Sequence, residues 1–267
     1  MQGLAERYPV ALITGASAGL GLATARMLLE QGVQVIGLSR NAGFLEEHPG
    51  YTHISCDISD LAAVERVCAE LWQQYPKLNL VINNAGYGIL SELDNLQPAA
   101  IQSQYAVLLV APSLLARAAI AQFKSKGEGC LVNVASLATE LPLPLMPIYN
   151  ASKSGLSALS KSLQLDLFDM PNCRVIDFRP GDFNTQFADN MQGEVSWNGA
   201  NLRKVMDQHH ASAPDASVAV NALHRALIAR RSGIVRVGSF FQARIAPLGR
   251  FLPWRLLQRL ICQYYKR

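Results

Sequence analysis

The sequence has few of the features that mark secreted, metal-binding or membrane-spanning proteins. Its five cysteines are scattered over 267 residues, with no CxxC pair, so we expect neither a zinc site nor a disulfide framework. The first residues lack the basic start and long apolar core of a signal peptide. The longest apolar stretch, 105–121, is interrupted by Pro112 and Arg117 and is shorter than the roughly 20 residues of a membrane span. We therefore expect a cytoplasmic protein without a bound metal.

Acidic residues are absent from the last part of the chain. No Asp or Glu follows Asp215, whereas residues 216–267 hold ten of the 24 lysines and arginines, so the preceding part has 14 basic and 20 acidic residues. Residues 253–265 combine leucines at helical spacing with Arg255 and Arg259, which predicts a basic amphipathic helix too short to cross a bilayer. It could pack on the domain or on a sister subunit, dock peripherally on a membrane, or bind an acidic partner such as an acyl carrier protein. No nucleic-acid partner is expected.

Short apolar runs and helix-like segments alternate along the rest of the chain. Half of the residues are apolar, enough for the core of one sizeable domain. The predicted strands lie at 10–14, 33–38, 53–56, 78–82, 130–134, 174–178 and 234–237. The predicted helices lie at 20–30, 61–74, 98–123, 149–168 and 216–230. This order predicts an α/β fold: a single domain over 1–267 with a doubly wound, Rossmann-type parallel sheet and helices on both faces.

Residues 182–213 interrupt this alternation with weak periodicity. Ligands of such sheets bind at the carboxyl ends of the strands, where long loops often cover them, so we predict a mobile lid. The pair His209-His210 within it is a candidate substrate contact. Together with the leucine- and proline-rich loop 137–148, the lid predicts a hydrophobic pocket; the alternative is that the apolar groups only pack the lid onto the domain. The aromatic lid residues that would line the pocket are Phe183, Phe187 and Trp197.

A glycine-rich turn between the first strand and the first helix is a candidate phosphate site. Gly15, Gly19 and Gly21 stand there in a GxxxGxG spacing, where backbone NH groups and the positive end of the helix can hold a phosphate. The second strand ends in Ser39-Arg40 at the place where an NAD site needs an acidic residue. A guanidinium suits the 2′-phosphate of NADP, so NADP is preferred. A plain strand–helix connection and a solvated Arg40 are the alternatives.

Two reactive groups, Tyr149 and Lys153, stand four residues apart in a predicted helix and therefore share one face. A neighbouring cation lowers the pKa of a phenol from its ordinary value of about 10, so Tyr149 could act as an acid or a base. As an isolated pattern, YxxxK is weak evidence for catalysis. Its significance depends on the motifs around it.

Further motifs follow the other predicted strands. In chain order the full set is TGASAGLG at 14–21, Asp57, Asn83-Asn84-Ala85-Gly86, Ser136, Tyr149 with Lys153, and Pro180-Gly181 with Thr185. These six motifs, each at its expected strand end, resemble the short-chain dehydrogenase/reductase family in its compact single-domain form. The resemblance covers residues 10 to about 240.

The resemblance implies an oxidoreductase that interconverts a carbonyl and an alcohol, and Ser39-Arg40 make NADP(H) its expected cofactor. Tyr149 would exchange a proton with the substrate oxygen, Lys153 would lower the pKa of Tyr149 and hydrogen-bond the nicotinamide ribose, and Ser136 would orient the substrate. Reduction of a lipophilic ketone or aldehyde by a homo-oligomer, a dimer or tetramer, is the favoured activity. An NADP-binding regulatory or scaffold protein without turnover, and an isomerase that keeps its cofactor, are the alternatives. The implied cofactor contacts are Gly15, Ser17, Gly19, Leu20, Gly21, Ser39, Arg40, Asp57, Ile58, Asn84, Ala85, Gly86, Tyr149, Lys153, Pro180, Gly181, Phe183 and Thr185.

One position departs from the family pattern. The family usually has an asparagine that kinks the long helix before the fifth strand and holds a water near the lysine, and this position falls on Leu108. A shift in register would let Gln104 serve instead. Because leucine cannot hold a water, we expect proton resupply by another water route.

Overall fold

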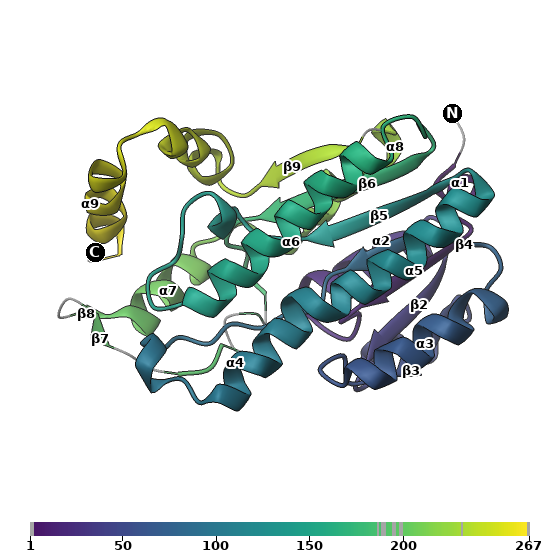
Figure 1. Ribbon diagram of the computed structural model, residues 1–267, viewed down its shortest axis with the longest axis horizontal. Helices are drawn as coiled ribbons and strands as arrows, with labels where there is room; N and C mark the ends of the chain where they lie inside the picture. Colours follow the sequence, from purple (N-terminus) through teal and green to yellow (C-terminus); the bar gives the residue numbers. More distant parts are fainter. Residues whose placement is uncertain are drawn as a thin grey trace.

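The computed structural model describes residues 3–185, 187, 191–193, 196–197, 200–230 and 232–265. Its centre is a seven-stranded sheet in the order β3-β2-β1-β4-β5-β6-β9, in which every neighbouring pair is parallel (Figure 1). The strands are β1 (Val10–Thr14), β2 (Gln34–Ser39), β3 (Tyr51–Ser55), β4 (Leu78–Asn83), β5 (Gly129–Val134), β6 (Cys173–Pro180) and β9 (Gly233–Val237). The strand order changes direction between β1 and β4, which opens a ligand-binding crevice at the carboxyl ends of these strands. The predicted doubly wound α/β fold is confirmed.

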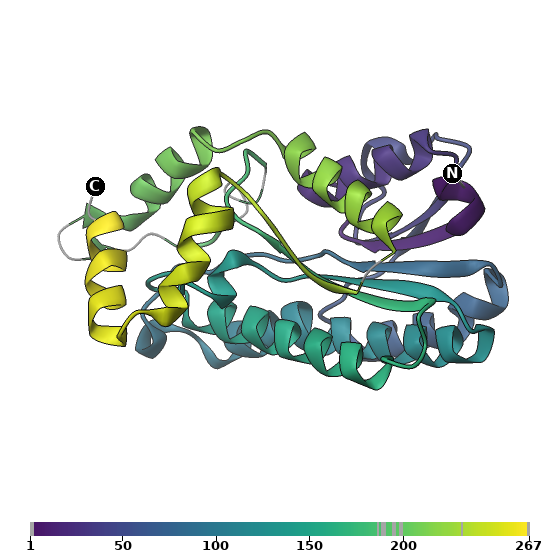
Figure 2. The same cartoon turned by 90° about the horizontal axis from the view of Figure 1, so that it is seen from above.

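Helices cover both faces of the sheet (Figure 2). On one face lie α3 (Leu61–Gln74), α5 (Ala111–Lys126) and α6 (Pro147–Asp166). On the other lie α2 (Gly19–Glu30) and α8 (Ala216–Ala229). Shorter helical elements are α1 (Leu4–Arg7), η1 (Gly43–Leu45), η2 (Leu93–Asn95) and η4 (Leu137–Thr139).

The strands supply side chains to two hydrophobic clusters because successive residues of a strand point to opposite faces. Leu12, Val81 and Val175 belong to the cluster under α3, α5 and α6. Ile13 and Ile82 belong to the cluster under α2 and α8. All of these strand residues are buried, as expected for a parallel sheet covered on both sides.

The long helix predicted at 98–123 is interrupted by a π turn. It runs through α4 (Pro98–Tyr105), η3 (Ala106–Val110) and α5, and η3 is the π-helical part. The continuous helix has 29 residues and, by length and composition alone, could cross a membrane. The length of the apolar stretch 105–121 was therefore not a sufficient reason to exclude a membrane span. The helix packs on β4, β5, α3 and α6. A buried core helix therefore accounts for its apolar composition.

The predicted lid at 182–213 contains more regular structure than its weak periodicity indicated. A short antiparallel pair, β7 (Ser196–Trp197) and β8 (Ala200–Asn201), precedes α7 (Leu202–Ala211). Asn201 caps α7 by accepting a hydrogen bond from the backbone NH of Lys204 at 3.1 Å. The residues buried on α7 are Leu202, Val205, Met206 and His210. Lid positions 186, 188–190, 194–195 and 198–199 lie outside the described residues, and the mobility of the lid stays a prediction.

The residues after β9, 239–265, form a region that we call the C-terminal segment. It consists of η5 (Phe241–Ile245), η6 (Ala246–Phe251) and α9 (Trp254–Tyr264), and α9 confirms the helix predicted at 253–265. In Figure 1 the segment is yellow and stands beyond the carboxyl ends of β5, β6 and β9. It touches α7, since the ring centroids of His209 and Tyr264 are 4.7 Å apart. The segment therefore lies at the same end of the sheet as the predicted site.

Candidate active site

A cavity of about 1070 Å³ opens at the carboxyl ends of the strands. With one exception, every residue that we predicted to touch cofactor or substrate oxygen lines it. The exception is Gly21, where an added Cβ would lie 2.2 Å from the carbonyl oxygen of Gly15 and 2.4 Å from Nδ2 of Asn84. Gly21 therefore allows α2 to pack closely on the turn before it and does not line the cavity.

The glycine turn presents the N-terminus of α2 to the cavity. Gly15 and Gly19 have φ values of +68° and +52°, a region that favours glycine. The N-cap residue of α2 is Ala18, which offers no side-chain hydrogen bond to the first NH groups of the helix. These groups, together with the positive end of the helix dipole, can bind a phosphate.

Asn84 joins the glycine turn to β4. Its backbone NH and that of Ala85 both donate to Oγ1 of Thr14 at 2.9 Å, and its Nδ2 donates to the carbonyl oxygen of Thr14 at 2.9 Å. An added Cβ on Gly15 would lie 3.0 Å from Cα of Ala85. The Asn-Asn-Ala-Gly motif therefore holds the ends of β1 and β4 together beneath the cavity, a role that the sequence alone could not separate from cofactor contact.

The end of β2 is basic. Arg40 is exposed and lines the cavity, while Ser39 is buried and donates its hydroxyl to the carbonyl oxygen of Asn41 at 2.7 Å. Asp57, at the end of β3, accepts hydrogen bonds from the backbone NH and hydroxyl of Ser59, and these bonds lower its pKa, with a smaller contribution from the charge of Arg40. The cavity is therefore lined by a carboxylate after β3 and by a guanidinium directly after β2.

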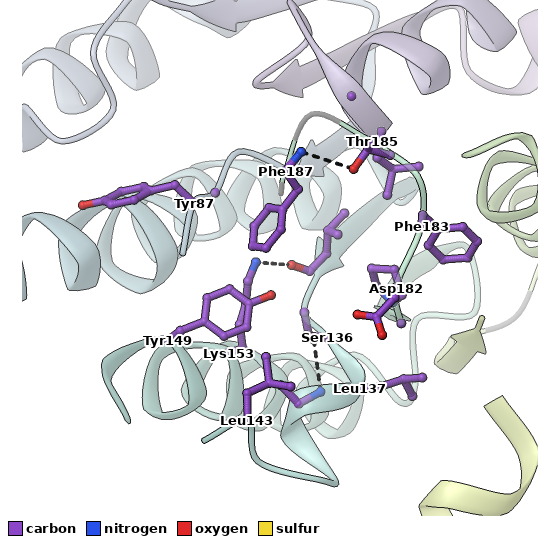
Figure 3. Close-up of a pocket in the computed structure, with 18 of the residues that line it drawn as sticks. Tyr87, Ser136, Leu137, Leu143, Tyr149, Lys153, Asp182, Phe183, Thr185 and Phe187 are labelled. Atoms are coloured by element: carbon purple, nitrogen blue, oxygen red, sulfur yellow. Dashed lines mark hydrogen bonds between the residues drawn. The ribbon is translucent and has the colours of Figure 1, made fainter. Parts of the chain in front are cut away.

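Ser136, Tyr149 and Lys153 project into the same part of the cavity (Figure 3). Tyr149 and Lys153 come from the first turns of α6 and are buried, and Nζ of Lys153 lies 5.9 Å from the ring centroid of Tyr149. Nζ of Lys153 also donates to the carbonyl oxygen of Val134 at 2.7 Å. Ser136 follows β5, and its Oγ accepts a hydrogen bond from the backbone NH of Ala138 at 3.0 Å. The three predicted catalytic groups are therefore brought together.

Burial controls the protonation of this group. Burial raises the pKa of Tyr149 to about 12, against the opposite effect of a hydrogen bond with Ser136, and the charge of Asp182 raises it further. Burial lowers the pKa of Lys153 to about 8. Our expectation that Lys153 would lower the pKa of Tyr149 was wrong for this structure, because desolvation of the phenolate is the larger effect. Tyr149 is therefore a protonated phenol at neutral pH and suited to donate a proton.

Leu108 lies in the π turn, close to Gly86 and Lys153. It is fully buried, and an added Cβ on Gly86 would lie 3.0 Å from Cδ2 of Leu108 and 3.6 Å from Nζ of Lys153. Gln104 instead points its Nε2 at the carbonyl oxygen of Tyr87, at 3.5 Å. The π turn thus interrupts the helix at the position where the family usually has its kinking asparagine. In this chain the apolar side chain of Leu108 occupies that position.

The sequence reasoning missed a buried charged cluster, one member of which, Glu140, lines the cavity. Arg179 on β6 donates to Oδ2 of Asp177 at 2.7 and 3.0 Å, to Oε1 of Glu140 at 2.5 Å and to Oγ of Ser157 at 2.7 Å. Arg236 on β9 also donates to Oε1 of Glu140, at 2.6 Å. The cluster ties η4, which follows Ser136, to β6, α6 and β9. Since Glu140 and Arg236 are 96 residues apart, no local motif could indicate it.

The walls of the cavity confirm part of the predicted hydrophobic lining. Phe183 and Phe187 line it, and the ring centroids of Phe187 and Tyr149 are 5.9 Å apart. His210 lines it as well, whereas His209 packs against Tyr264 and Tyr265. The side chain of Trp197 lies outside the described residues. The wall that we did not predict comes from the C-terminal segment, with Phe241, Ile245, Leu248, Leu252, Leu257, Leu260, Ile261, Tyr264 and Tyr265.

Comparison with known proteins points to one family. The protein-family model described as "short chain dehydrogenase" matches residues 9–195 of this chain. The chain is 30% identical to "Uncharacterized oxidoreductase C162.03" of Schizosaccharomyces pombe, over 69% of this chain and 64% of that protein. It is also 30% identical to the 3-ketodihydrosphingosine reductase of Bacteroides thetaiotaomicron, over 68% of this chain and 66% of that protein. The aligned part thus spans just under two thirds of the length of these two relatives.

Solved structures share the fold. A short-chain dehydrogenase from Streptomyces avermitilis superposes with a TM-score of 0.81 at 24% identity, over 97% of both chains. A short-chain dehydrogenase from Sphingobium yanoikuyae in complex with NADPH has a TM-score of 0.70 at 22% identity, over 85% of this chain and 87% of that chain. The 4-hydroxyisoleucine dehydrogenase complexed with NADH has a TM-score of 0.72 at 22% identity, over 85% of this chain and 96% of that chain.

Proposed function

Because this chain belongs to the short-chain dehydrogenase family, we propose that it is an NADP(H)-dependent oxidoreductase that reduces a lipophilic ketone or aldehyde to the alcohol. The observation that carries the proposal is the meeting of Ser136, Tyr149 and Lys153 in one cavity with the uncapped N-terminus of α2. The first group is a proton donor with its orienting partners, and the second is a site for a dinucleotide phosphate.

The residues at the strand ends fit a nicotinamide dinucleotide. Gly15 and Gly19 leave room where a Cβ would be strained, and the first NH groups of α2 would hold the pyrophosphate. Asp57 and Ile58 would contact adenine, and Pro180, Gly181, Phe183 and Thr185 line the opposite end of the cavity, where the nicotinamide would lie. When bound, the cofactor supplies the hydride.

The preference for NADP rests on the residue after β2. Arg40 is exposed, lines the cavity and can form paired hydrogen bonds with a 2′-phosphate. No carboxylate stands there to accept hydrogen bonds from the ribose hydroxyls, as an NAD site requires. Solved relatives are described with either NADH or NADPH, so they do not distinguish the two cofactors.

Tyr149 would donate a proton to the carbonyl oxygen as the hydride reaches the carbon. A phenol with a pKa of about 12 is fully protonated at neutral pH, and the Ser136 hydroxyl can hold the substrate oxygen beside it. Lys153 would stabilise the phenolate left on Tyr149, because its ammonium lies over the ring. This division of roles favours reduction over oxidation near neutral pH.

The lipophilic substrate class follows from the lining of the cavity. Leucines 137, 141 and 143, with Phe183 and Phe187, surround the approach to Tyr149, and the C-terminal segment adds a further apolar wall. One of the relatives is named for the reduction of 3-ketodihydrosphingosine, which is compatible with such a pocket. We further propose that the protein works as a homo-oligomer, a dimer or tetramer, in the cytoplasm.

The test is NADPH consumption with a panel of small, aromatic and long-chain carbonyls, comparing the wild type with Tyr149→Phe. We expect turnover with apolar carbonyls and a loss of about 100-fold or more in the variant, the range of general acid catalysis. Tight NADPH binding without turnover of any carbonyl or alcohol would favour the regulatory protein. Conversion of a substrate without net NADPH consumption would favour the isomerase.

A further inference from the structure

Among the residues that the structure describes, most of the exposed large hydrophobic side chains lie in the C-terminal segment. Of sixteen such side chains in the described ranges, ten lie between Phe240 and Tyr264. Phe240, Phe251 and Trp254 are 76%, 70% and 57% exposed. Single exposed apolar residues are ordinary, but a concentration of them in one short segment marks an interaction surface.

The same segment forms the rim of the cavity. The residues that are both exposed and line the cavity are Phe241, Ile245, Leu248, Leu252, Leu260 and Tyr264. Gln242, also in η5, fixes the segment beside the site, because its Nε2 donates to Oδ2 of Asp182 at 2.6 Å. Leu257 and Tyr265 are buried and pack α9 inward. The apolar surface is therefore continuous from the outside of the segment to the interior of the cavity.

Cations surround this apolar surface. Arg244, Arg250, Arg255 and Arg259 are all exposed, and the chain contains no Asp or Glu after Asp215. On α9 the exposed Leu256 and Leu260 stand one residue after Arg255 and Arg259, so the leucines and arginines form neighbouring stripes along the helix. An apolar stripe beside a basic one is the pattern of a helix that lies in the interface of an anionic bilayer.

We infer that the C-terminal segment docks on an anionic lipid surface and places the mouth of the cavity against it. The basic residues would face lipid headgroups, while Phe240, Phe251 and Trp254 would enter the boundary between headgroups and acyl chains. This inference rests on the proposed function for one consequence only: an apolar carbonyl compound dissolved in the bilayer would enter the cavity along the apolar rim without crossing water.

A second copy of the chain is the competing occupant of this surface. A symmetric contact would place the same patch of both subunits face to face. The four exposed arginines of one segment would then meet those of the other, with no acidic residue in either segment to compensate them. An anionic lipid surface complements the same charges, which is why we favour it.

Vesicle binding tests the inference without substrate or cofactor. The wild type should float with vesicles of phosphatidylcholine containing phosphatidylglycerol, bind vesicles of phosphatidylcholine alone more weakly, and lose binding as salt is raised. Trp254→Glu should weaken binding about tenfold or more. The matched control is Phe168→Glu, since Phe168 is 82% exposed beyond the opposite end of α6 from Tyr149 and should bind as the wild type does.

Three results would overturn the inference: equal vesicle binding by Trp254→Glu and wild type, no binding by the wild type, or equal losses in Trp254→Glu and Phe168→Glu. An oligomer of the wild type that Trp254→Glu dissociates in solution, without any vesicle binding, would assign the surface to a second copy instead. Tyr149→Phe should bind vesicles as the wild type does whether or not the protein is a reductase. Failure of the proposed function and failure of this inference are therefore distinguishable.

Discussion

The two halves of the sheet hold their polar side chains in opposite ways. In the half formed by β1 to β4, Thr14 and Asn84 bond to nearby backbone, and the charged groups Arg40 and Asp57 are exposed. In the half formed by β5, β6 and β9, charged side chains are buried and bond to one another. Asp177 is 0% exposed there and Arg179 3%.

This difference separates binding from stability. An exposed charged residue at the edge of a cavity can be replaced at little cost to the free energy of unfolding, because water solvates its charge when no ligand is bound. Buried charges that depend on one another support the structure, because the loss of one leaves its partners desolvated and unpaired. Replacing an arginine by methionine should therefore lower stability in the half formed by β5, β6 and β9, and change cofactor choice in the half formed by β1 to β4.

The largest effect should come from Arg179→Met. This change leaves the carboxylate of Asp177 buried without its cation and removes one of two partners of Glu140, so we expect the free energy of unfolding to fall by about 3–5 kcal/mol. Urea unfolding would measure it. Arg40→Met is the matched control, and its unfolding free energy should change by no more than about 0.5 kcal/mol. Equal losses in the two variants would remove the distinction between the halves.

The next largest effect should be a change in cofactor preference, from NADPH toward NADH, in Arg40→Met. Loss of charge-assisted hydrogen bonds to a 2′-phosphate should lower the ratio of kcat/KM with NADPH to that with NADH by about 10- to 100-fold. Steady-state kinetics with both cofactors would measure this ratio. Arg26→Met, an exposed change on α2 away from the cavity, is the control. A ratio unchanged in Arg40→Met would mean that Arg40 is only solvated and that the NADP assignment is wrong.

The sequence predicted the first half of the site better than the second for the same physical reason. The glycine turn, Ser39-Arg40 and Asp57 act through neighbouring backbone or exposed groups, so short motifs indicate them. The motif at Asn84 was indicated only through the family resemblance, since its hydrogen bonds reach Thr14, 70 residues away. The Glu140 cluster and the C-terminal wall of the cavity depend on residues distant in the chain, and no local pattern reveals such pairing. The pKa of Tyr149 was predicted in the wrong direction because YxxxK specifies a neighbouring cation but not the burial of the phenol.

A smaller effect should be the pH dependence of kcat/KM, which the protonation of Lys153 and Tyr149 controls. Lys153 has a pKa lowered by burial to about 8, whereas that of Tyr149 is raised to about 12. The proposed reduction uses the proton of Tyr149, which is present throughout, and the charge of Lys153, which is lost as the pH rises through about 8. We therefore expect kcat/KM for carbonyl reduction to be level below pH 8 and to fall above it by about tenfold per pH unit. A profile that stays level up to pH 10 would show that the charge of Lys153 is not needed.

The smallest effect on turnover should come from Leu108→Asn, at the junction between Gly86 of the first half and Lys153 of the second. Leucine is fully buried in the π turn, so asparagine should destabilise the fold by about 1–3 kcal/mol unless a water pairs with its amide. A water there would add a route from Lys153 toward solvent, so kcat should equal or exceed that of the wild type. Leu115→Asn, an equally buried leucine on α5 that does not line the cavity, is the control for destabilisation alone. A large loss of kcat in Leu108→Asn but not in Leu115→Asn would show that proton resupply already depends on the apolar side chain.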